Sequence, residues 1–251
     1  MYPDLFKNTP YQIATWDLFL LIGFIFVIVL AAIKKPRDFP LNRLTIIILP
    51  VLLLICGFFG AKLLYIYLHR KTIFVVTRST LAEAFPSAGY AFLGGLFAEI
   101  AALAAFVKIR IKRISFLVFA DYAVPFLILH EAIVRIGCFF AGCCYGKPTD
   151  LPWACVFLKD NIRRHPTQLY ESLILAITYF SMRHIYKKGA PKGVVFFGTI
   201  GMYTFLRFFV EYFRADSFPV IGDITLAQVT VFAIATVCAI ALLIILKRGK
   251  R

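Results

Sequence analysis

The segment WDLFLLIGFIFVIVLAAI, residues 16–33, is an apolar run in which Asp17 is the single charged residue. About 20 apolar residues in an α-helix cross the hydrocarbon core of a bilayer. The run is followed by Lys34 and Lys35, and no small-residue cleavage site of a signal peptide accompanies it. We therefore expect a retained transmembrane helix here.

Further apolar runs follow along the chain, at residues 44–67, 88–107, 114–144, 167–182, 193–213 and 224–246. Together they predict an all-α integral membrane protein with about seven transmembrane helices. The run at 114–144 is too long for one straight helix, and Pro125, Gly137 and Gly142 favour a broken or re-entrant segment near 130–146. Because the sequence contains no low-complexity linker and no apparent soluble domain, we expect residues 1–251 to form one polytopic membrane domain.

The composition supports lipid as the main solvent of this chain. Of its 251 residues, 61% are hydrophobic and 16% are charged, and the formal net charge is +15. The predicted loops on one side carry about twice as many Lys and Arg residues as those on the other, which predicts an outer N-terminus and a cytoplasmic C-terminus. No basic patch interleaved with aromatic residues indicates nucleic acid as a partner.

Four basic residues fall within or at the edge of predicted spans: Lys62, Arg135, Arg207 and Arg214. An arginine at bilayer depth costs about 2.5 to 3.5 kcal/mol even on lenient scales, so it usually faces a polar cavity and has a partner. Helical spacing offers Glu131 to Arg135 and Glu211 to Arg207. Two guanidinium groups in one cavity indicate an anionic ligand such as a phosphate.

The alternative is that these charges are structural ion pairs or snorkelling side chains, which applies most to Lys62 and Arg214. Three acidic residues also have two possible locations, in the polar cavity or at the membrane interface: Glu99, Asp121 and Glu171. His130 lies within a turn and a half of Arg135 and is a candidate general base. A hydrogen-bonded packing role is the alternative for this histidine.

Cysteines gather around one predicted membrane edge, at Cys138, Cys143, Cys144 and Cys155. The spacing of the first three lacks the C-x2-C pattern of zinc and thioredoxin-like sites, so it does not favour a metal or redox site. Packing, or a disulfide to Cys155, is the simpler expectation. A nucleophilic thiolate close to the arginines stays open.

The stretch RIGCFFAGCCYG, residues 135–146, resembles the signature R-I-G-N-F-x-N-x-E-x-x-G of the prolipoprotein diacylglyceryl transferase family. Other family patterns follow in order along the chain. They are G-x-x-G-A-R-L at GFFGAKL (57–63), H-G-G-L at 93–96, H-P-[ST]-Q-L-Y-E at HPTQLYE (165–171), and R-F-x-x-E-x-x-R-x-x-D at 207–217, where Arg214 and Asp216 follow RFFVE.

The resemblance implies an enzyme of the bacterial inner membrane that moves the diacylglyceryl group of phosphatidylglycerol to a prolipoprotein cysteine and releases glycerol phosphate. It implies no metal and no organic cofactor. By position, the catalytic residues would be Arg135, Arg207, Glu211 and, from the charge argument, His130. The substrate-binding residues would be Arg135, Arg207, Gly137, Cys138, Cys143, Gly146, Tyr170 and Arg214.

Four polar positions of the family pattern differ here: Leu93 replaces a histidine, Cys138 an asparagine, Cys143 a glutamate and Trp16 a tyrosine. A relative that uses phosphatidylglycerol to modify another envelope molecule, perhaps by glycerophosphate transfer, is therefore a second hypothesis. A lipid-binding or transport protein that uses the intramembrane charges is a third. A thiol oxidoreductase built on Cys143 and Cys144 is a fourth.

Overall fold

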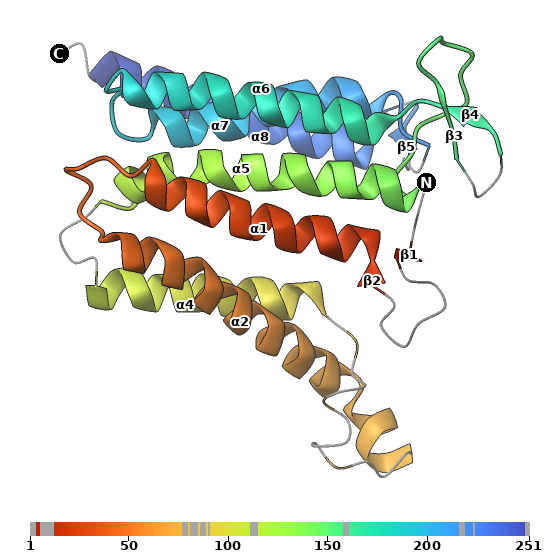
Figure 1. Ribbon diagram of the computed structural model, residues 1–251, viewed down its shortest axis with the longest axis horizontal. Coiled ribbons are helices and arrows are strands. Elements are labelled where there is room, and N and C mark those ends of the chain that lie inside the picture. Colours follow the sequence, from red (N-terminus) through yellow and green to blue (C-terminus); the bar gives the residue numbers. More distant parts are fainter. Residues whose placement is uncertain are drawn as a thin grey trace. The chain divides into compact units, whose positions relative to one another are not determined.

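The computed structural model in Figure 1 describes residues 4–5, 13–76, 80, 85, 89, 91–110, 115–157, 161–215, 219–222 and 224–248. The chain forms two compact units, one of Met1–Ala31 with Ser115–Arg251, and one of Ala32–Ile114. Asp216 of the C-terminal motif lies outside the described residues.

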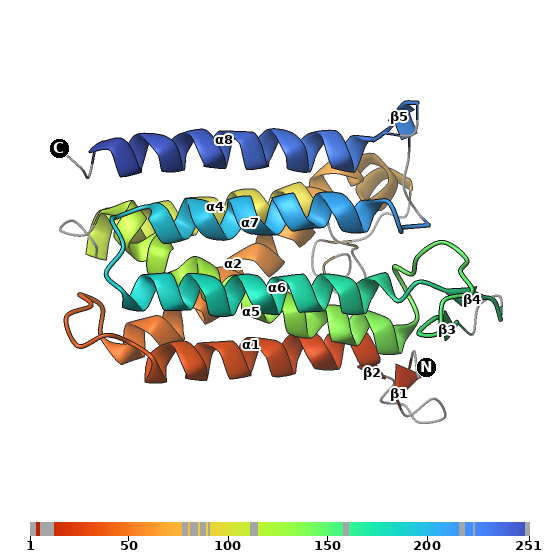
Figure 2. The same cartoon turned by 90° about the horizontal axis from the view of Figure 1, so that it is seen from above.

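Five long helices build the first unit: α1 (Thr15–Ile33, in this unit as far as Ala31), α5 (Phe116–Ala141), α6 (Thr167–Lys187), α7 (Val194–Glu211) and α8 (Leu226–Arg248). α5 packs against α6 and α7, and α7 also packs against α6 and α8. Figures 1 and 2 show these four helices running side by side. α1 is joined to α5 by the Tyr122 hydroxyl, which donates to the carbonyl of Ala31 over 2.6 Å.

Three short antiparallel sheets lie at the end of this unit where α1, α6 and α8 begin (Figure 1). Their strands are β1 (Asp4–Leu5) with β2 (Ile13–Ala14), β3 (Cys155–Val156) with β4 (Arg163–Arg164), and β5 (Pro219–Ile221) with β6 (Ile224–Thr225). In the second sheet Cys155 lies opposite Arg164. This end of the unit carries the loops that surround the candidate site.

Among its described residues, the second unit contains α2 (Arg43–Leu68), the π-helical turn η1 (Lys71–Val76) and α4 (Phe92–Arg110). α2 begins at Asn42, whose side-chain oxygen accepts from the Thr45 amide over 2.7 Å, as an N-cap does. α2 and α4 cross where a methyl group on Gly60 or Gly94 would collide with the other helix. Lys62 is buried in this unit and donates to the Phe85 carbonyl over 2.8 Å.

Among the described residues, five helices are long and apolar enough to cross a membrane: α1, α2, α5, α7 and α8. This confirms a helical multi-pass membrane protein. The other two long helices, α4 and α6, have 19 and 21 residues, about the length that a bilayer core requires. α6 is less apolar because one face buries polar side chains, including Gln168, Glu171 and Thr178.

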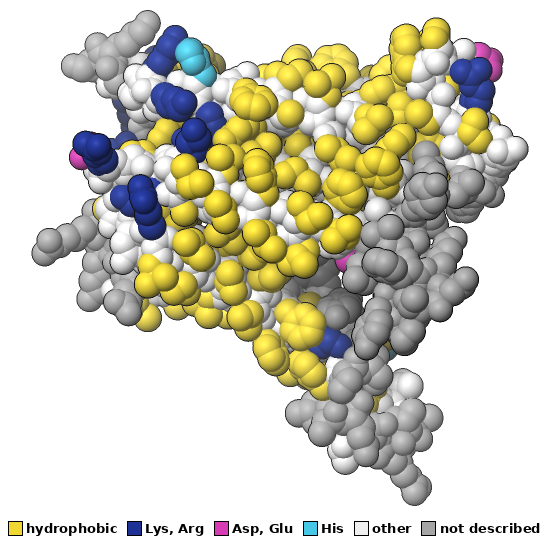
Figure 3. Space-filling model, viewed as in Figure 1, with side chains coloured by type: hydrophobic (Ala, Val, Ile, Leu, Met, Phe, Trp, Pro, Cys, Tyr) yellow, Lys and Arg dark blue, Asp and Glu magenta, His cyan; other side chains and the backbone are white. Residues whose placement is uncertain are grey.

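The outer surfaces of the helices are apolar. Phe180 of α6, Leu127 of α5 and Phe232 of α8 are each more than 60% exposed, as expected of side chains that face lipid. Figure 3 shows hydrophobic side chains over the middle of the helices on one face, with basic side chains gathered at the end where α1 and α6 finish. This distribution matches a spanning orientation of the first unit.

The expected break in the segment 130–146 is wrong. α5 is one continuous helix from Phe116 to Ala141, and Pro125 lies inside it with its ring fully buried. Gly137 allows α1 to approach α5 so closely that a methyl group there would collide with Phe19. The chain leaves the helix at Gly142, whose φ of 74° is left-handed.

Asp121 sits at the opposite end of α5 and caps another helix. Its carboxylate oxygens accept from the amides of Gly193, over 2.6 Å, and Phe196, over 2.7 Å, at the start of α7. A carboxylate at this place also complements the positive end of the helix dipole. Asp121 therefore anchors the start of α7 to α5.

Candidate active site

Glu171 of α6 is the centre of a charge cluster, and its side chain is 0% exposed. Its Oε2 lies 2.8 Å from Nε of Arg135 on α5, and its Oε1 lies 2.9 Å from Nε of Arg207 on α7. Oε1 also accepts a hydrogen bond of 3.2 Å from Nη1 of Arg214, just beyond α7. One buried carboxylate therefore joins three helices or their ends.

Two further carboxylates complete this cluster. Glu131 Oε1 lies 2.9 Å from Arg135 Nη2, and Glu211 Oε2 lies 2.7 Å from Arg207 Nη1. Both pairs have the i, i+4 spacing that the sequence predicted. Arg214 Nε also lies 3.9 Å from Glu211 Oε2, so this arginine belongs to the cluster and does not snorkel. Three guanidinium groups and three carboxylates make the cluster formally neutral.

The exposure of the cluster is uneven. Glu171 is completely buried, whereas the side chains of Arg135, Arg207 and Arg214 are 21%, 14% and 11% exposed. The three arginine side chains are therefore partly accessible, and a fully buried carboxylate holds each of them in place. Such preorganised, partly desolvated guanidinium groups suit a phosphate, which accepts charge-assisted hydrogen bonds.

His130 lies on α5 one and a half turns before Arg135. Its Nε2 is 3.2 Å from the Leu20 carbonyl of α1, and its ring meets Phe24 edge to face. The structure therefore places His130 at the contact between α1 and α5. Its role as a general base stays a prediction.

Gly146, a predicted substrate-binding residue, permits a close approach of the backbone to the protein's own chain. Its amide donates to the His165 carbonyl over 2.9 Å, and it bridges to Arg214. A methyl group at Gly146 would lie 2.5 Å from the Phe213 carbonyl oxygen and 2.6 Å from His165 Cβ. The glycine thereby allows the loop after α5 to reach the residues that carry Arg214.

The segment 165–171 positions this loop as well as Glu171. The Thr167 hydroxyl donates to the Cys144 carbonyl over 2.8 Å, and the Gln168 amide group donates to the Cys143 carbonyl. Tyr170, a predicted substrate-binding residue, accepts through its hydroxyl from Trp153 Nε1 over 2.7 Å. The same hydroxyl lies 3.2 Å from Nδ1 of His165, whose pKa is lowered by burial.

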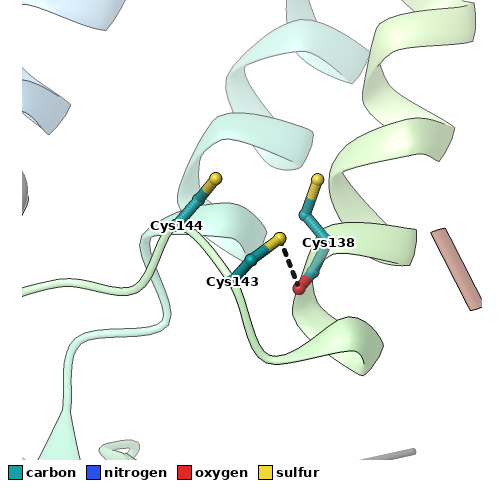
Figure 4. A group of neighbouring side chains, drawn as sticks. All are labelled: Cys138, Cys143 and Cys144. Carbon is teal, nitrogen blue, oxygen red and sulfur yellow. Dashed lines mark hydrogen bonds between the residues drawn. The ribbon is translucent and has the colours of Figure 1, made fainter. Parts of the chain in front are cut away.

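Figure 4 shows three thiols from the end of α5 and the turn that follows it: Cys138, Cys143 and Cys144. Their sulfur atoms all lie within 4.8 Å of one another. The expected disulfide to Cys155 is wrong, since all six cysteines are free and Cys155 belongs to β3. The sequence spacing gave no reason to expect this cluster, because the turn at Gly142 brings the residues together.

The Cys144 thiol is the most acidic of the thiols outside the spans. A hydrogen bond from the Cys138 thiol lowers the pKa of Cys144, and the charges of Arg214 and Arg135 lower it further. Burial instead raises the pKa of Cys143. The three thiols and the three arginines therefore form one connected region in the first unit.

Sequence reasoning named Arg135, Arg207, Glu211 and Arg214 as site residues, and the structure brings all four together. It left Glu171 undecided, although this residue touches more of the cluster than any of them. One pattern could have indicated that Glu171 is buried and paired. It lies one turn after Gln168 on a helix face that also buries Thr178, and an acidic residue on a buried face requires a partner.

Comparison with known sequences agrees with this arrangement. A sequence model described as prolipoprotein diacylglyceryl transferase matches residues 3–245. A protein of Clostridium tetani named phosphatidylglycerol–prolipoprotein diacylglyceryl transferase is 31% identical over 223 residues, which are 86% of each chain. Proteins with the same name from Mannheimia succiniciproducens and Nitrosospira multiformis are 32% and 30% identical, over 84% and 89% of this chain and 79% and 78% of their own.

Proposed function

Because this chain belongs to the prolipoprotein diacylglyceryl transferase family, we propose that it transfers the diacylglyceryl group of phosphatidylglycerol to the cysteine thiol of a prolipoprotein. The reaction forms a carbon–sulfur bond and breaks the bond between the glyceryl carbon and the phosphate oxygen. Glycerol phosphate leaves with the electron pair of the broken bond. The observation that carries this proposal is the meeting of three arginines on the buried carboxylate of Glu171.

In this proposal Arg135 and Arg207 bind the lipid phosphate. Each side chain is partly exposed while Glu171 holds its Nε. As the leaving group departs, its phosphate gains negative charge, and fixed donors stabilise that charge more than they stabilise the bound lipid. The two arginines would therefore act mainly on the rate of transfer, and Arg214 would complete the phosphate site.

The proposed function also requires a particular orientation of the protein in the membrane. The Glu171 cluster draws on the first two turns of α6 and the last turns of α5 and α7. The three short sheets lie at the end of the first unit where α6 begins, and the basic side chains gather at the other end (Figures 1 and 3). With the basic end in the cytoplasm, the site opens toward the outer side of the bacterial inner membrane. Exported prolipoproteins and phosphatidylglycerol both reach that side. All seven long helices would span the membrane.

The test uses purified protein in micelles that contain phosphatidylglycerol, with a peptide that carries the acceptor cysteine. Transfer adds one diacylglyceryl group to the peptide mass and releases glycerol phosphate. Arg135→Ala and Arg207→Ala should each lower the rate at least about 100-fold, the loss of one donor to a developing anion. Arg163→Ala is the matched control, because this exposed arginine of β4 lies outside the cluster.

Full transfer activity in both cluster variants would contradict the proposal. Release of diacylglycerol in place of glycerol phosphate would instead indicate glycerophosphate transfer, the second hypothesis from the sequence. A peptide with serine at the acceptor position should stay unmodified, because the serine hydroxyl is a far weaker nucleophile than a thiolate.

A further inference from the structure

The cluster of Cys138, Cys143 and Cys144 is not explained by binding of the lipid phosphate. Thiols attract no anion, yet three of them lie beside the arginines with their sulfur atoms within 4.8 Å of one another (Figure 4). We propose that these three sulfur atoms bind one Zn²⁺ ion and leave its fourth position open for the thiol of the acceptor. The second half of this proposal rests on the proposed transferase function, whereas the first half does not.

The distances suit a zinc ion. With Zn–S bonds of about 2.3 Å, tetrahedral geometry separates sulfur ligands by about 3.8 Å. The sulfur atoms need to approach one another by no more than about 1 Å from a spread of 4.8 Å, which side-chain rotation supplies. Cysteine sulfur is also the ligand that zinc and other thiophilic ions prefer over harder ions.

The backbone that carries the thiols is built in advance. Gly142 takes a left-handed φ, and the amide of Cys143 donates to the Cys138 carbonyl over 3.2 Å, so the chain turns back toward α5. Cys144 has a φ of 59°, which is uncommon for a residue with a side chain. This conformation directs Cys144 back beside the other two cysteines and costs the folded state some energy.

Contacts from α6 fix the same turn. Thr167 and Gln168 donate from the first turn of this helix to the carbonyls of Cys144 and Cys143. The two donors are fully buried or nearly so, which leaves little freedom for the turn. Ligands that already converge lose little conformational entropy when a metal binds.

The open position follows from the exposure of the ligands. Cys138 is buried, Cys144 is intermediate and Cys143 is exposed, so one side of the cluster is accessible from outside. Zinc sites with three protein ligands keep a fourth position for water or substrate, whereas four protein ligands close the site. No fourth Cys, His, Asp or Glu joins the three cysteines among the described residues.

An acceptor thiol that binds at this position loses its proton to the solvent. The sulfur then attacks the glyceryl carbon of the lipid, the carbon–sulfur bond forms, and the carbon–oxygen bond to the phosphate breaks. The oxygen keeps that electron pair and leaves on glycerol phosphate, held by the arginines. Leu93 occupies the place of the histidine in the family pattern, so thiol activation requires another group.

The chain offers a matched pair of triple variants for the test. Cys138→Ser, Cys143→Ser and Cys144→Ser remove the cluster, and Cys56→Ser, Cys155→Ser and Cys238→Ser remove the other three thiols. Both proteins, reduced and in micelles, are equilibrated with Zn²⁺ and freed of excess ion, and bound zinc is measured by elemental mass spectrometry. We expect about one zinc per chain in the second variant and almost none in the first. Equal uptake by the two, or no uptake by either, overturns the site.

A second measurement does not depend on the folding of the cluster-free variant. Co²⁺ bound to the variant that retains the cluster should show the charge-transfer absorption of three cobalt–sulfur bonds. Zn²⁺ should displace this signal and protect the three cysteines from alkylation, as read by peptide mass. Cobalt without that absorption, or alkylation unchanged by Zn²⁺, overturns the site.

The role in acceptor binding has its own test. An acceptor peptide should alter the Co²⁺ absorption when it carries cysteine and leave it unchanged when it carries serine. Zinc-free enzyme that transfers at the full rate overturns this role while the transferase function stands. Protein that binds zinc but transfers to no peptide overturns the transferase function, and the metal site stands.

Discussion

Oε2 of Glu171 lies 2.8 Å from Nε of Arg135, so α6 and α5 are joined by an ion pair whose carboxylate is 0% exposed. The same carboxylate holds Arg207 through its other oxygen. Glu171 is thus both a structural tie between helices and the group that fixes the orientation of two arginines. Its removal should affect stability and transfer together.

Glu171→Gln keeps the shape of the side chain and removes its charge. The cluster is then left with three guanidinium groups and two carboxylates. Loss of one partner of a buried ion pair costs about 3 to 5 kcal/mol of unfolding free energy. We expect a clearly lower midpoint of thermal unfolding in micelles and a large loss of glycerol phosphate release.

Glu131→Gln is the control for this prediction, because its side chain is 38% exposed and it touches only Arg135 among the ion pairs of the described residues. An exposed pair contributes about 1 kcal/mol or less. Similar destabilisation by the two substitutions would contradict the prediction that the buried carboxylate of Glu171 contributes more to the free energy of unfolding than the exposed carboxylate of Glu131.

Gly146→Ala should destabilise the protein through a direct collision. The added methyl group would lie 2.5 Å from the Phe213 carbonyl oxygen and 2.9 Å from the His165 carbonyl oxygen, so backbone atoms would have to shift. Gly189→Ala is the control, since no atom of the described residues lies within 4 Å of a methyl group there and the cost is the strain of a φ of 73°, about 1 to 2 kcal/mol. The unfolding midpoint of Gly146→Ala should be the lower of the two, and the reverse order would refute the close approach.

Much of the fold could be predicted from the sequence. The apolar runs predicted α1, α2, α7 and α8 to within two residues at each end, because burial in lipid imposes a length that hydropathy reveals. Pro125 was misleading. A proline breaks a helix in water, but buried packing against neighbouring helices holds α5 continuous through it.

The candidate site could be predicted only in part. Glu131 with Arg135 and Arg207 with Glu211 are one turn apart on single helices, so local spacing reveals them. Glu171 reaches its partners from another helix, and no local pattern encodes which helices meet. The cluster of thiols depends on the left-handed turn at Gly142, which spacing rules for metal ligands do not anticipate.

Alkylation of Cys144 should proceed at lower pH than alkylation of an ordinary thiol. The hydrogen bond from Cys138 and the charges of Arg214 and Arg135 lower the pKa of Cys144, so the thiolate persists as the pH falls, until it reaches that lowered value. An unperturbed cysteine has a pKa of about 8.5. In metal-free protein, the iodoacetamide reaction at Cys144 should therefore be half-maximal well below pH 8.5.

Cys138→Ala and Arg214→Gln each remove one cause of this shift, so both should move the midpoint of Cys144 alkylation upward. Peptide mass spectrometry reads the extent of alkylation at Cys144 in each protein. A midpoint for Cys144 at or above pH 8.5 in the unsubstituted protein would contradict the predicted acidity.

Asp121→Asn should lower the stability of the protein without changing its transfer rate. The carboxylate accepts from the amides of Gly193 and Phe196, and asparagine retains one acceptor oxygen but loses the charge at the helix N-terminus. Loss of such a cap costs about 1 to 2 kcal/mol. Asp121 lies 14 residues before Arg135 on the same helix, about 21 Å along its axis. We therefore expect a lower unfolding midpoint with an unchanged transfer rate at temperatures where the variant is folded. A fall in that rate comparable to the fall in Glu171→Gln would mean that the start of α7 controls the position of Arg207 at its other end.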